Sequence, residues 1–103
     1  MLKKFNPKYS IGSLFICTKC GLSFDNPDGE FADKLKTSLR SELKSIEAHT
    51  KIRVMTSGCL GVCQNNEQAI GYYPHEGYSE VYTTSASYSD AQTELMNLIK
   101  SKI

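Results

Sequence analysis

The hydrophobic and polar positions along the chain predict four strands and two helices. Strands are expected at 13–17, 51–56, 68–73 and 78–83, because each run is short, apolar or alternating, and bounded by turn residues. Between 29 and 47, apolar residues recur with helical spacing among lysines and serines, which indicates an amphipathic helix. A second such stretch predicts a helix at 90–102, with Ser87 or Ser89 as its N-cap. The apolar positions expected to be buried are Phe31, Ala32, Leu35, Leu39, Leu43 and Ile46 in the first helix and Ala91, Leu95, Leu98 and Ile99 in the second.

The order of these elements, βαβ followed by ββα, predicts an α/β domain with a four-stranded mixed sheet and two main helices. A strand–helix–strand unit joins parallel strands by a right-handed crossover, so the first two strands should end at the same edge of the sheet. The last two strands flank a turn at 74–77 and should form an antiparallel hairpin. The first strand is nearly all apolar, which predicts that both of its faces are covered. Residues 1–12 show no periodicity and are expected to form an N-terminal arm before a domain at 13–103.

Charge and hydropathy exclude several classes of partner. Lys and Arg number 12 against 11 Asp and Glu, so no basic excess indicates nucleic acid. No apolar run approaches the ~18–20 residues that a membrane span needs. The N-terminal lysines are not followed by the apolar stretch of a signal peptide. We therefore expect a cytoplasmic protein with neither a membrane nor a nucleic-acid partner.

The four cysteines form two close pairs, each just past a predicted strand: Cys17 with Cys20, and Cys59 with Cys63. Because the first two strands should end at one edge, we expect the four sulfurs around a single inorganic site there. In a reducing compartment, paired cysteines bind metal or take part in catalysis more often than they form structural disulfides. The second pair lies in a Gly-Cys-x-Gly-x-Cys loop, whose glycines allow main-chain amides to approach sulfur. One helical turn is expected at 60–65.

These residues also carry a resemblance to a known family. Leu14-Phe15-Ile16-Cys17, the segment from Val54 to Cys63, and Ile70-Gly71-Tyr72-Tyr73-Pro74 resemble the thioredoxin-like [2Fe-2S] ferredoxins over residues 13 to 102. The resemblance implies a thioredoxin-like fold and a cluster near the surface, with one iron on each cysteine pair. It further implies a one-electron carrier that is not an enzyme, a redox protein partner and a homodimer. The first cysteine pair is more closely spaced than in that family.

Two other functions fit the same cysteines. Cys17-Thr18-Lys19-Cys20-Gly21 alone is typical of a zinc knuckle, so a structural zinc site in an interaction module is one alternative. A dithiol oxidoreductase that uses Cys17 and Cys20 is another. His49 and His75 lie in polar stretches and are expected to be solvated. No other catalytic set stands out. Tyrosines near the second hairpin would serve packing or a partner surface; they are Tyr72, Tyr73, Tyr78, Tyr82 and Tyr88.

Overall fold

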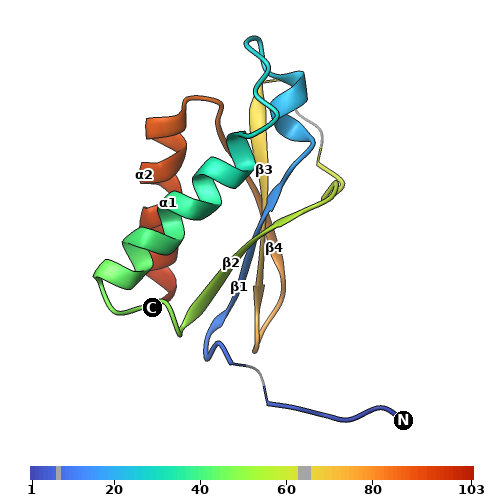
Figure 1. Ribbon diagram of the computed structural model, residues 1–103, viewed down its shortest axis with the longest axis vertical. Coiled ribbons are helices and arrows are strands. Elements are labelled where there is room, and N and C mark those ends of the chain that lie inside the picture. The colour runs from blue at the N-terminus through green and yellow to red at the C-terminus, as the bar shows by residue number, and fades with distance from the viewer. Residues whose placement is uncertain (7, 63–65) are drawn as a thin grey trace.

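The computed structural model of the protein describes residues 1–6, 8–62 and 66–103. Its elements are β1 (Gly12–Cys17), a short 3₁₀ helix η1 (Cys20–Ser23), α1 (Phe31–Ser45), β2 (Ile52–Ser57), β3 (Glu67–Pro74), β4 (Glu80–Ser85) and α2 (Tyr88–Lys102). All predicted strands and helices are present, with ends displaced by a few residues. Figure 1 shows the N-terminal end of the chain extending away from the sheet.

The four strands form one mixed sheet in the order β2-β1-β3-β4. β1 pairs in parallel with β2, whereas β3 is antiparallel to both β1 and β4. The predicted α/β class, the four-stranded mixed sheet and the antiparallel hairpin are therefore confirmed. The parallel register pairs Cys17 with Ser57, so β1 and β2 end side by side.

Both helices cover the same face of the sheet (Figure 1). α1 packs on β2 and β1, while α2 packs on β4 and on α1. The covered face presents alternate strand residues such as Leu14, Ile16 and Ile70, all fully buried. Helix residues buried against them are Phe31, Ala32, Leu35, Leu39 and Leu43 from α1 and Ala91, Leu95, Met96 and Ile99 from α2.

Two expectations about burial are wrong. β1 is not covered on both faces: its burial alternates, and Phe15 is only half-buried, because both helices lie on the side of Leu14 and Ile16. Ile46 is exposed, since α1 ends at Ser45. Residues 60–62 are not helical, and the rest of the helical turn expected at 60–65 lies outside the described part of the chain.

The uncovered face of the sheet carries an aromatic pair. Phe15 of β1 and Tyr73 of β3 meet edge to face, with ring centroids 5.4 Å apart. The Tyr73 ring lies over Gly71, where an added Cβ would collide with it. In the described ranges, no helix is both long enough and apolar enough to cross a membrane.

Candidate metal centre

Three of the four cysteines lie at the edge of the sheet where the parallel strands end. Cys17 is the last residue of β1, Cys20 opens η1, and Cys59 follows the end of β2 by two residues. In Figure 1 this edge is at the top, beside η1. The predicted shared edge of the two parallel strands is confirmed, and the convergence of the four sulfurs on one site stays a prediction. Cys63 lies outside the described residues.

Thr18 ties the two loops together. Its backbone N–H donates to the Ser57 carbonyl at 2.9 Å, and its hydroxyl donates to the same oxygen at 3.0 Å. The loop that carries Cys17 and Cys20 is thereby bonded to the strand end that leads into Cys59. Two hydrogen bonds to one carbonyl therefore hold the loops together at this edge.

Each of the three cysteine sulfurs accepts a backbone hydrogen bond. Lys19 N–H donates to Cys17 Sγ, Ala69 N–H to Cys20 Sγ, and Gly61 N–H to Cys59 Sγ, each at 3.4 Å. The donors come from three different segments, two of them in the cysteine loops and one in β3. Such N–H groups stabilise negative charge on sulfur, which favours thiolate ligands or a cluster of sulfur and metal.

The two glycines of the second loop differ in their roles. Gly61 has a φ of +82°, in the left-handed region that favours glycine, and this conformation directs its N–H toward Cys59. A Cβ at Gly58 would meet nothing within 4 Å. A Cβ at Gly61 would also meet nothing within 4 Å, so it is the positive φ of Gly61, and not crowding, that favours glycine there.

The three described cysteines differ in their exposure to solvent. Cys17 and Cys20 are 1% and 9% exposed, whereas Cys59 is exposed. Cys17 and Cys59 carry free thiols. A group bound here would have a buried side on β1 and η1 and a solvent-facing side on the loop after β2.

Across residues 1–6, 8–62 and 66–103, no three His, Cys, Asp or Glu side chains gather closely enough to hold one metal ion. His49 and His75 are exposed, as expected of solvated histidines. The described residues offer the sulfurs of Cys17 and Cys20, which are close in sequence, and the single sulfur of Cys59. A ligand set of two plus two, as a [2Fe-2S] cluster requires, depends on Cys63.

The sequence analysis missed Gln68. This residue starts the buried part of β3 and is fully buried, with its side-chain amide next to the Cys17 carbonyl. The signal was available: Gln68 has the same strand parity as Ile70 and Tyr72, which both face the core. A polar residue at such a position indicates a specific hydrogen-bonding role.

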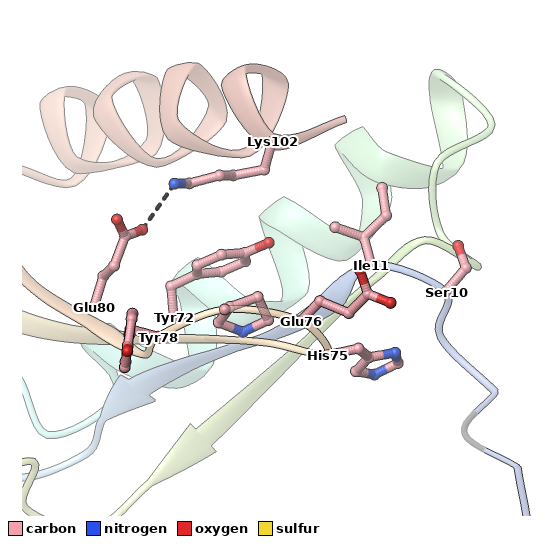
Figure 2. Close-up of a pocket in the computed structure, with 10 residues that line it drawn as sticks. Ser10, Ile11, Tyr72, His75, Glu76, Tyr78, Glu80 and Lys102 are labelled. Atoms are coloured by element: carbon pink, nitrogen blue, oxygen red, sulfur yellow. Dashed lines mark hydrogen bonds and ion pairs between the residues drawn. The ribbon is translucent and has the colours of Figure 1, made fainter.

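A shallow pocket of about 640 Å³ lies at the opposite end of the sheet. Figure 2 shows Lys102 of α2 reaching across Tyr72 to Glu80 of β4, with His75, Glu76 and Tyr78 around the rim. Lys102 Nζ lies 2.8 Å from Glu80 Oε1 and 5.2 Å from the centre of the Tyr72 ring. The last turn of α2 is thus bonded to the start of β4, far from the cysteines.

This ion pair should make stability depend on acidic pH. Hydrogen bonds from Lys102 and then Tyr82 hold the pKa of Glu80 below its ordinary value of 4.5. A depressed folded-state pKa gives stability that is present above the unfolded pKa and is lost as pH falls through the folded value. Lys102→Met should therefore lower the thermal midpoint at neutral pH. On further acidification, the midpoint of this variant should fall by less than that of the wild type. Parallel acid titrations of both proteins measure this, and identical slopes below about pH 4.5 would contradict it.

Asp28 gives this titration an internal reference. A hydrogen bond from the Glu30 N–H, and then one from Lys34, lower its pKa as well. Lys102→Met leaves these contacts intact, so the Asp28 contribution should persist in both proteins. Only the difference between the two curves reports on Glu80.

Comparison of the chain with protein-family models, with curated proteins and with solved structures found no match.

Proposed function

We propose that this protein is a one-electron carrier that holds a [2Fe-2S] cluster on Cys17, Cys20, Cys59 and Cys63, as the thioredoxin-like ferredoxins do. The observation that carries the proposal is the parallel register of β1 and β2, which puts Cys17 and Ser57 side by side. Cys17 and Cys20 would hold one iron, and Cys59 with Cys63 the other. The cluster would supply reversible one-electron chemistry.

The donor chemistry of the described residues fits such a group. Three sulfurs accept backbone N–H groups, and hydrogen bonds of this kind tune the potential of an iron–sulfur cluster. The open space at Gly58 and Gly61 would leave room for inorganic sulfide at the loop that carries Cys59. Exposure of Cys59 would bring one side of the cluster to the surface, where a redox protein partner could exchange an electron.

Structural zinc is the second candidate, and the Cys17-x-x-Cys20 spacing favours it. A zinc site would make the protein an interaction module, since zinc has no redox chemistry. The dithiol oxidoreductase is less well supported. Reactive cysteines of that class are partly exposed and often lie at a helix N-terminus, whereas Cys17 and Cys20 are buried and α1 begins only at Phe31.

The proposal extends to a homodimer, as the family resemblance implies. The exposed aromatic residues offer a surface for it: Tyr73 on the uncovered sheet face, and Tyr78 at the hairpin. Aromatic side chains are enriched in interfaces of this kind.

Metal analysis of protein purified without oxygen tests the function. We expect about two irons and two acid-labile sulfides per chain, as four-thiolate ligation of this cluster requires. Dithionite should bleach the visible absorption and produce a paramagnetic signal of one electron. Colourless protein with one zinc per chain would overturn the electron carrier in favour of the interaction module. Metal-free protein that cycles a Cys17–Cys20 disulfide would instead support the oxidoreductase.

A further inference from the structure

The ladder between β1 and β3 stops at the first cysteine. The two strands pair from Gly12 with Pro74 up to Ile16 with Ile70. His75 N–H donates to the Ile11 carbonyl at 2.9 Å. Hydrogen-bonded and non-hydrogen-bonded residue pairs alternate along an antiparallel ladder. Counted from Ile11 and His75, the first hydrogen-bonded pair beyond Ile16 would be Cys17 with Ala69. In a continued ladder, the Ala69 N–H would donate to the Cys17 carbonyl.

Two other bonds replace that one. The Ala69 N–H points instead to Cys20 Sγ at 3.4 Å. The Cys17 carbonyl accepts the side-chain Nε2 of Gln68 at 2.8 Å, and the same Nε2 lies 3.0 Å from the Ala69 carbonyl. Because both partners are carbonyl oxygens, the donor orientation of the Gln68 amide is fixed. Gln68 therefore takes the acceptor that Ala69 would otherwise use.

In the part of the chain that the structure describes, the oxygen of the Gln68 amide has no partner. Gln68 Oε1 is buried and accepts no hydrogen bond within the described residues. An unpaired buried oxygen is a cost that an apolar residue of the same length would avoid. The hydrogen bonds that Gln68 Nε2 donates must therefore contribute more than this cost.

From these contacts we infer that Gln68 is a positioning residue of the cysteine site, which keeps the Ala69 N–H directed at the Cys20 sulfur. By satisfying the Cys17 carbonyl, its side chain lets β1 part from β3 and admits Cys20 beside Ala69. The hydrogen bond to sulfur stabilises negative charge there, so Gln68 sets the reactivity of Cys20 and the potential of any cluster that Cys20 binds. The second consequence rests on the proposed function, but the first does not.

Gln68→Met tests the inference, because methionine keeps the length and removes the donor. In metal-free reduced protein, alkylation of Cys20, followed residue by residue by mass spectrometry, should slow by up to about tenfold, the factor that one net hydrogen bond is worth, because the attacking thiolate loses the N–H group that stabilises it. Thr84→Val is the matched control. Thr84 is the register partner of Gln68 on β4 and the other buried polar residue among those described, and its variant should leave the rate within about twofold. An unchanged or faster rate in Gln68→Met, or an equal slowing in Thr84→Val, would overturn the assignment.

A measurement on the wild type keeps the inference testable if Gln68→Met fails to fold. The side-chain amide protons of Gln68 should exchange slowly with solvent, because Nε2 is buried between two carbonyls. Fast exchange would overturn the inference. In iron-loaded protein, Gln68→Met should lower the reduction potential, because the Cys20 sulfur loses a donor, whereas Thr84→Val should not. Failure of the chain to bind iron would remove the proposed function, while the alkylation and exchange results would still decide the role of Gln68.

Discussion

Replacing Cys59 with serine should remove the iron of the proposed [2Fe-2S] cluster, while the metal-free chain keeps its stability. Cys59 is exposed, and its sulfur accepts only the Gly61 N–H among the contacts described here. Serine at this position removes a thiolate ligand without opening a cavity in the core. We expect iron to fall from about two per chain to less than about one, because the cluster needs four thiolates. Iron and sulfide analysis measures the loss, and thermal unfolding of the metal-free proteins measures stability.

Ser57→Ala is the control for this substitution. It changes the same loop by removing the hydroxyl that donates to the Gly58 carbonyl at 3.0 Å, but it removes no sulfur. Its iron content should match that of the wild type. Full iron content in Cys59→Ser would exclude Cys59 as a ligand and with it the four-cysteine site. Equal loss in both variants would assign the effect to the loop rather than to the sulfur.

The fold could be predicted from the sequence because its signals are local and periodic. Leu35, Leu39 and Leu43 mark one helical face, and they are fully buried in α1. The turn at 74–77 separates two runs with strand character, and these form the hairpin of β3 and β4. The edge shared by Cys17 and Cys59 followed from the parallel crossover alone. In each case a short stretch of sequence determines the outcome.

What could not be predicted depends on the arrangement of whole layers. The apolar run of β1 is compatible with cover on one face or on both, and only the placement of α2 beside α1 decides that Phe15 remains half-buried. The hydrogen bond from Ala69 to the Cys20 sulfur joins residues 49 positions apart. No spacing rule links them, because the bond exists only where β1 parts from β3.

Gly21, the residue after Cys20, lies at a close approach between two backbone segments. It follows Cys20 in η1 and packs against the loop that precedes α1, where the Asp28 N–H donates to the Gly21 carbonyl at 2.9 Å. A Cβ at Gly21 would overlap the carbonyl oxygen of Asp28 and come within 3.5 Å of the Phe31 Cβ. The obstacle is backbone and cannot move aside by changing a rotamer. Asp28 is itself fixed, since its carboxylate accepts the Glu30 N–H at 2.9 Å.

Gly21→Ala should therefore destabilise the protein by about 3 kcal/mol, as overpacking at a buried close approach does. The urea midpoint of metal-free protein measures this. Gly29→Ala is the matched control in the same loop, because a Cβ there would make only an ordinary contact, 3.6 Å from Leu22 Cδ2. That variant should be neutral or stabilise by a few tenths of a kcal/mol, through the smaller entropy of the unfolded chain. Equal midpoints for the two variants would show that η1 can shift to accommodate the added Cβ without loss of stability. In that case the contact between Gly21 and Asp28 would not fix the position of Cys20.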